Sequence, residues 1–137
     1  MEKKPFEETH NLHRLLLATA IVAQGQGDAI GKIFHDNEAY FTIHTHGHGT
    51  APSMIIDMLG LSDTKKTIVF SVVKEDRWPI IRQALEQRFS VSKLSKGICY
   101  ALPLDAVMGV SAYKMLSNSG FSEIKESRKR HFWRKEK

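Results

Sequence analysis

Three histidines and two glycines alternate within one short segment of the chain: His44, His46, Gly47, His48 and Gly49. The histidines are two residues apart, so on one extended strand their imidazoles would share a face, a workable geometry for a transition metal. The glycines can adopt positive φ angles, which would let the backbone curl and turn its N–H groups toward one anion. The segment therefore indicates either a metal site or a small-anion site.

A short apolar helix is expected directly behind this segment. Pro52 and Ser53 are typical of a helix start, Gly60 is typical of a helix end, and the residues between them are mostly apolar. The N-terminus of a helix presents unpaired N–H groups and the positive end of its dipole. We therefore expect a glycine turn over residues 47–49 that a helix N-terminus reinforces as an anion site.

Four strands and two long helices are expected to position that turn. Runs of apolar and β-branched residues predict the strands, over residues 15–23, 40–44, 67–73 and 98–102. Helical spacing predicts long helices that begin after Asp28 and Asp76, which are suitable N-caps, and a further helix within residues 104–116. This order predicts an α+β fold, a ferredoxin-like βαββαβ sandwich with both long helices on one face of the sheet.

The opposite face of that sheet needs a cover, because its four strands are too apolar to be left in water. A second copy of the chain is the simplest cover, so we expect an oligomer. The pattern along the chain predicts three parts: a lead-in at residues 1–14, a folded domain at 15–110 and a C-terminal extension at 111–137.

Composition limits the class of protein. The chain has 137 residues, of which 42% are apolar and 26% charged, as expected for one soluble domain. No apolar run approaches the ~20 residues that span a bilayer, and the mixed charges of the first twelve residues do not resemble a secretory signal. The single cysteine, Cys99, excludes an internal disulfide and suits a reducing compartment. We expect a cytoplasmic protein.

The net charge of +5 is concentrated at the C-terminus. Residues 122–137 contain seven Lys or Arg and three Glu, interleaved with Phe132 and Trp133. Such a basic tail could contact nucleic acid or an anionic membrane. The interpretation favoured here is a solvated segment whose two aromatic side chains pack on the body of the protein.

Several segments together resemble the short-loop members of the PII-like nitrogen-regulatory proteins. Residues 46–53 (HGHGTAPS) resemble their Gly-x-Gly-Thr segment, and residues 56–61 (IDMLGL) resemble the apolar helix that follows it. The strand at residues 68–73 and the segment at 96–104 (KGICYALPL) are similar to their third and closing strands. The match covers about residues 15–110, and the order and spacing of the motifs make it fairly specific.

The resemblance implies a homotrimer that binds small effectors, usually adenine nucleotides (ATP, ADP or AMP), in the clefts between subunits. It implies a regulator with no enzymatic activity, which controls a transporter or an enzyme by reshaping the loop between strands two and three. In the nucleotide-binding members the loop glycines and the glycine before the last strand line the cleft. The ligand-binding residues expected here are Gly47, His48, Gly49, Thr50, Lys96 and Gly97.

Two departures from the family pattern bear on the effector. ATP-binding members place a lysine where this chain has Ile98, and Lys96 is the only local substitute. They also place arginines near residues 107–110, where this chain has none. Polyphosphate needs several cations or a metal to offset its charge. The effector is thus either an adenine nucleotide or another small anion.

Two other functions remain open from the sequence. One is a metal-binding or metal-tolerance protein that uses His44, His46 and His48 to hold a divalent transition metal. The other is a nucleic-acid binder that acts through the basic tail. An enzyme is not indicated, because Asp57 and Asp63 have no catalytic partner placed by spacing.

Overall fold

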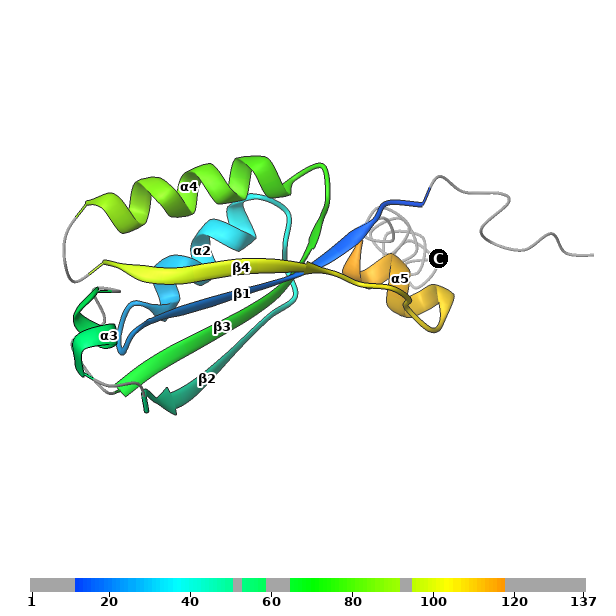
Figure 1. Ribbon diagram of the computed structural model, residues 1–137. Coiled ribbons are helices and arrows are strands. Elements are labelled where there is room, and N and C mark those ends of the chain that lie inside the picture. The colour runs from blue at the N-terminus through cyan, green and yellow to red at the C-terminus, as the bar shows by residue number, and fades with distance from the viewer. Residues whose placement is uncertain (1–11, 51–52, 59–64, 92–94, 118–137) are drawn as a thin grey trace, which may run out of the picture.

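Four antiparallel strands form one sheet in the order β2-β3-β1-β4. A computed structural model describes residues 12–50, 53–58, 65–91 and 95–117. The strands are β1 (Leu15–Ala23), β2 (Thr42–His48), β3 (Lys65–Lys74) and β4 (Gly97–Pro103), and the helices are α2 (Gly27–Asp36), α3 (Ser53–Met58), α4 (Trp78–Ser90) and α5 (Val110–Leu116). Helices α2 and α4 lie on the same face of the sheet (Figure 1). The predicted α+β, ferredoxin-like fold is confirmed.

The hydrophobic core lies between those two helices and the sheet. Ile30 and Phe34 of α2 and Ile81 and Leu85 of α4 are each at most 2% exposed. They pack against alternate residues of β1, where side chains that point to the same face are two positions apart. Those residues are mostly small, which allows the helices to approach the sheet closely: Leu16, Ala18, Ala20 and Val22.

No helix in the described part of the chain covers the other face of the sheet (Figure 1). We call this surface the open face. Cys99 and Ala101 pack against the core, so strand alternation places their neighbours on the open face. Tyr100 is 43% exposed there, Leu102 is 54% exposed, and Ile43 on β2 is 48% exposed. The described chain therefore leaves uncovered the apolar sheet surface for which the sequence predicted a subunit partner as cover.

Some predicted boundaries were wrong. The N-caps of α2 and α4 are Gln26 and Arg77, and neither makes a side-chain capping hydrogen bond, so Asp28 and Asp76 are not the caps. Helix α2 begins early because a tight turn ends β1: the Gln26 backbone N–H donates to the Ala23 carbonyl over 3.1 Å. The intervening Gly25 adopts a φ of +91°, which glycine tolerates best.

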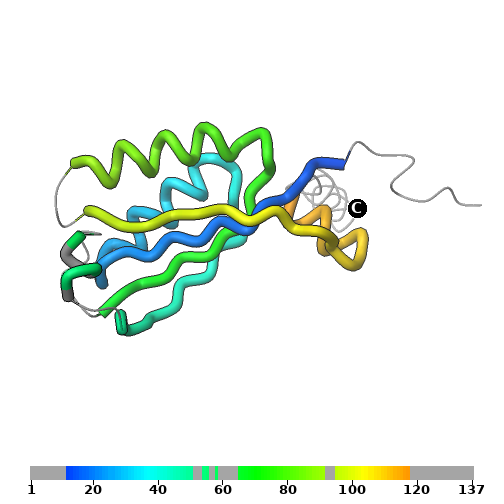
Figure 2. Tube along the Cα trace, in the orientation of Figure 1, coloured from blue at the N-terminus to red at the C-terminus, as the bar shows by residue number. Residues whose placement is uncertain are grey.

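The additional helix expected within residues 104–116 is present as α5. It lies with the start of β1 at the end of the sheet opposite to α3 (Figure 2). Pro52 and Gly60, the predicted limits of the short helix, lie outside the described residues, as does the basic tail. None of the described helices combines the length and the apolar character needed to span a membrane.

Candidate functional site

The segment around Gly47 is a strand, so the predicted glycine turn was wrong. Strand β2 continues through Gly47 to His48, and these residues pair with Lys66 and Lys65 of β3. Neither Gly47 nor Gly49 has a positive φ; among the described glycines only Gly25 and Gly109 do. Pairing with β3 outcompetes the turn, because each paired residue satisfies its backbone hydrogen bonds in the ladder.

A small cavity of about 240 Å³ lies where β2 ends. We call its lining the β2-end site, and it consists of Gln24, His46, Gly47, His48, Lys65 and Lys66. Lys66 is only 5% exposed, so its side chain is part of the wall of the cavity. Two lysines and two imidazoles around one cavity favour an anionic group over a cation.

The histidines share one face of β2, as the spacing predicted for a continuous strand. Within the described part of the chain, no group of three or more His, Cys, Asp or Glu is arranged to hold a metal ion. His44 packs against α2 instead. A Cβ atom added to Gly31 would lie 2.9 Å from His44 Nε2, and one added to Gly27 would lie 3.3 Å from Nδ1.

This packing gives a first prediction. Gly31 is in the interior of α2, where alanine is favoured over glycine by about 1 kcal/mol, but the His44 ring occupies the space that the methyl group needs. We expect Gly31→Ala to leave the protein no more stable, and to stabilise it by about 1 kcal/mol when His44→Ala has opened that space. Urea unfolding of the four proteins in this double-mutant cycle measures the coupling.

The control for that cycle is His46→Ala, which removes an imidazole from the same strand face but not from above Gly31. Gly31→Ala should have the same effect with and without His46. If Gly31→Ala changed the free energy of unfolding equally in the His44→Ala and His46→Ala variants, the His44 ring would not be what limits the space beside Gly31.

Gly97 begins β4 and lines a second cavity, of about 370 Å³, between that strand and α4. We call its lining the β4-end site: Trp78, Arg82, Leu85, Glu86, Phe89, Gly97, Ile98 and Cys99. Most of these side chains are apolar or aromatic, and Arg82 and Glu86 pair with each other over 2.9 Å. Burial raises the pKa of the Cys99 thiol to about 11, so at neutral pH it remains a protonated, unreactive group.

The two sites lie at the same end of the sheet but at opposite edges. Strands β2 and β4 are separated by β3 and β1, which corresponds to about 14 Å at the usual strand spacing. Within one chain the predicted ligand residues are thus divided between the two edges. Gly47 and His48 line the β2-end site and Gly97 lines the β4-end site, while Thr50 and Lys96 are exposed and Gly49 is half-buried without lining either cavity.

The sequence interpretation missed Lys65 and Lys66, which belong to β3 but lie just before the strand predicted over residues 67–73. A signal was available. In an antiparallel pair joined through a short helix, the first residues of the later strand must lie opposite the last residues of the earlier one. Because His48 was expected in a turn, its pairing with Lys65 was not predicted.

Comparison with solved structures shows which proteins share this architecture. A PII-like signalling protein from Thermus thermophilus superposes with a TM-score of 0.51 at 15% identity, over 69% of this chain and 90% of that one. CPII from Thiomonas intermedia K12, in a structure bound to ADP, AMP and acetate, gives 0.52 at 10% identity over 71% and 94%. The chain has the PII-like fold. CutA from Synechococcus elongatus PCC7942 is also similar, with a TM-score of 0.58 at 11% identity over 80% and 92%.

No protein-family model and no curated protein sequence matches the chain. At these identities the likeness establishes the PII-like fold and leaves function to the residues of the site. The resemblance drawn from the motifs is thereby confirmed for the architecture, over the part of the chain that carries the sheet and the two long helices.

Proposed function

We propose that this protein is a PII-like regulator, without enzymatic activity, that binds a small anionic effector between copies of itself. The observation that carries the proposal is the division of the candidate residues between two opposite edges of one sheet end. A ligand that contacts both sets must lie between neighbouring subunits, with the β2-end site of one copy beside the β4-end site of the next.

The open face supports the assembly that this arrangement requires. Ile43, Tyr100 and Leu102 are each more than 40% exposed on it, and contiguous apolar surface of this kind marks an interaction site. Packing three copies with these faces inward would cover the surface and bring unlike sheet edges together. The trimer is thus the oligomer that we propose.

The chemistry of the two sites supports a nucleotide as the effector. The β2-end site offers lysines and imidazoles that suit phosphate, and the β4-end site offers Trp78, Leu85 and Phe89, which suit a flat base. CPII, of the same fold, is described bound to ADP and AMP. ATP-binding members of the family place a lysine at the position of Ile98 and arginines near residues 107–110, and this chain has neither. Lys65 and Lys66 would supply cations in their place.

The test is a mass measurement by light scattering followed by thermal melts with ATP, ADP, AMP and inorganic phosphate. Ligand at one hundred times its Kd stabilises the folded state by about 2.7 kcal/mol, which raises Tm by several degrees for a chain of this size. We expect His48→Ala to reduce that rise. The matched control is His35→Ala, an exposed imidazole on α2 that lines neither site.

A monomeric mass would overturn the shared site. A trimer whose Tm responds to none of the four anions would leave the assembly standing and exclude them as effectors. Stoichiometric Zn²⁺ binding that is lost on His46→Ala would instead support the metal-binding function. The regulated transporter or enzyme is a further part of the proposal, to be sought by affinity capture in the presence and absence of the effector.

A further inference from the structure

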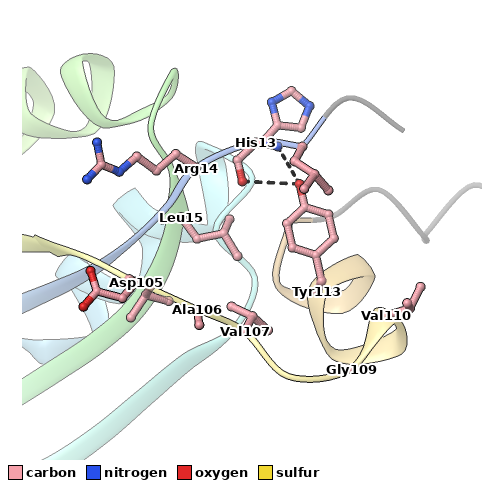
Figure 3. A pocket seen from close by; sticks show the side chains of 11 residues that line it. His13, Arg14, Leu15, Asp105, Ala106, Val107, Gly109, Val110 and Tyr113 are labelled. Atoms are coloured by element: carbon pink, nitrogen blue, oxygen red, sulfur yellow. Dashed lines mark hydrogen bonds between the residues drawn. The ribbon is translucent and has the colours of Figure 1, made fainter. Parts of the chain in front are cut away.

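A large cavity lies at the other end of the molecule, away from both ligand sites. It has a volume of about 810 Å³ and lies between the chain that leads into β1, the segment that follows β4 and helix α5 (Figure 3). The apolar and aromatic part of its lining is Leu12, Leu15, Leu104, Ala106, Val107, Val110 and Tyr113. The proposed effector site does not use this cavity.

Tyr113 forms one wall and is held in place by the backbone of the opposite wall. Its hydroxyl accepts a hydrogen bond from the His13 N–H over 2.5 Å and donates one to the His13 carbonyl over 3.3 Å. Figure 3 shows the Leu15 side chain pointing toward the Tyr113 ring, whereas the Arg14 and Asp105 side chains point away from it. Leu15 and Tyr113 therefore offer an apolar contact inside a cavity that polar groups also line.

This end of the molecule has little apolar cover in the described part of the chain. No residue of α5 is buried. Met108 is 93% exposed, Val110 is 46% exposed and Met115 is 53% exposed. Neighbouring apolar side chains that are exposed next to a cavity with apolar walls on one side favour a surface that another segment covers.

Residues 1–11 and 118–137 both join the described chain at this end, at Leu12 and at Ser117, and we argue for the C-terminal extension because it carries an adjacent aromatic pair. The described chain ends at Ser117, four residues after Tyr113, so residues 118–137 start beside the cavity. They contain one adjacent aromatic pair, Phe132–Trp133, within a run of Lys and Arg. The fourteen intervening residues, 118–131, span about 21 Å if helical and about 45 Å if extended. Either length exceeds the return along α5, which is about 10 Å long.

We propose that the Phe132–Trp133 pair of the C-terminal extension packs into this cavity, while the basic residues around it remain in water. Aromatic side chains bury large apolar areas, and Lys and Arg can keep their charged groups solvated beside them. Attraction between charges is not the cause, because Arg14 and His13 lie at the cavity together with Asp105. This packing, which we call the seat, would fix a strongly basic segment at the end of the fold remote from the proposed effector site.

Trp133 can report on its own surroundings. The 137-residue chain has two tryptophans, so Trp78→Phe leaves Trp133 as its only tryptophan. We expect its emission to be blue-shifted and its quenching by acrylamide to be several-fold weaker than in urea. Because the proposed contacts of Trp133 are with the apolar side chains of the cavity, this protection should persist in high salt, where electrostatic contacts are screened.

Filling the cavity tests its location. Val107→Phe should release Trp133 and restore strong quenching, and Ala106→Phe provides a second filling variant if the first does not fold as judged by circular dichroism. The matched control is Met108→Phe. Met108 directly follows Val107, but its side chain is exposed and does not line the cavity. It should leave Trp133 protected.

Three results would overturn the proposal. The first is that acrylamide quenches Trp133 as strongly in the native protein as in urea. Protection that appears only when anionic vesicles or nucleic acid are added would likewise contradict packing in the cavity. The second is protection that survives both filling variants. The third is protection that disappears in high salt. None of these outcomes depends on the mass of the protein or on its response to nucleotides, so the seat and the proposed effector site fail separately.

Discussion

Replacing Leu102 with Asp should reduce the mass in solution from three times 15.6 kDa to a single chain. Leu102 is 54% exposed on the open face, so the separate subunit tolerates a carboxylate at this position. In the proposed trimer the same carboxylate would be buried without a partner, at a cost of about 3–5 kcal/mol per site. Light scattering measures the mass, and circular dichroism verifies that the subunit remains folded.

The control for this prediction is Met108→Asp. Met108 is 93% exposed, more than Leu102, but it lies in the segment after β4 and not on the sheet. Its replacement should leave the oligomer intact. Loss of the oligomer in both variants would show a general effect of charge, and an unchanged mass for Leu102→Asp would place the interface elsewhere.

Gly97→Ala should lower the free energy of unfolding by about 1–3 kcal/mol, even though it adds only one methyl group. A Cβ atom at this position would lie 2.8 Å from the Ile21 carbonyl oxygen, 2.8 Å from Val22 Cγ1 and 3.1 Å from Phe89 Cε1. The Ile21 carbonyl belongs to the central strand and cannot move without disturbing the pairing of β1 with β4. Urea unfolding measures the loss.

Gly47→Ala provides the comparison. Gly47 is also a strand glycine among the candidate ligand residues, but its added Cβ would meet only Ile68 Cδ1, at an ordinary contact distance of 3.4 Å. Because glycine weakens a strand interior, alanine there should be neutral or slightly stabilising. Equal losses from the two substitutions would contradict the interpretation of Gly97 as a glycine required by close packing.

These two glycines show how far the sequence could predict the site. Both were assigned to a ligand site through the family resemblance, and Gly47 also through the conformational freedom of glycine. In the structure Gly97 is required because Phe89 and the backbone of β1 leave no space for a side chain, and Gly47 is an ordinary member of β2. Contacts of this kind depend on segments distant in sequence, which local patterns do not record.

The sequence by itself determined the architecture. Apolar runs and helical spacing were sufficient to predict four strands, two long helices on one face and an additional helix near residue 110, because these patterns follow from local backbone periodicity. Strand β1 was predicted to its observed ends. The motif resemblance added the PII-like fold, which the structural neighbours confirm.

Only the tertiary structure decided where the candidate residues lie relative to one another. Strand pairing extended β2 through the expected turn and brought Lys65 and Lys66 beside His48. Packing of α2 against β2 placed the His44 ring over Gly31. The order of the strands divided the site between two edges. Each outcome depends on which segments become neighbours in space, and that choice is made by burial of the whole core, which a local segment cannot specify.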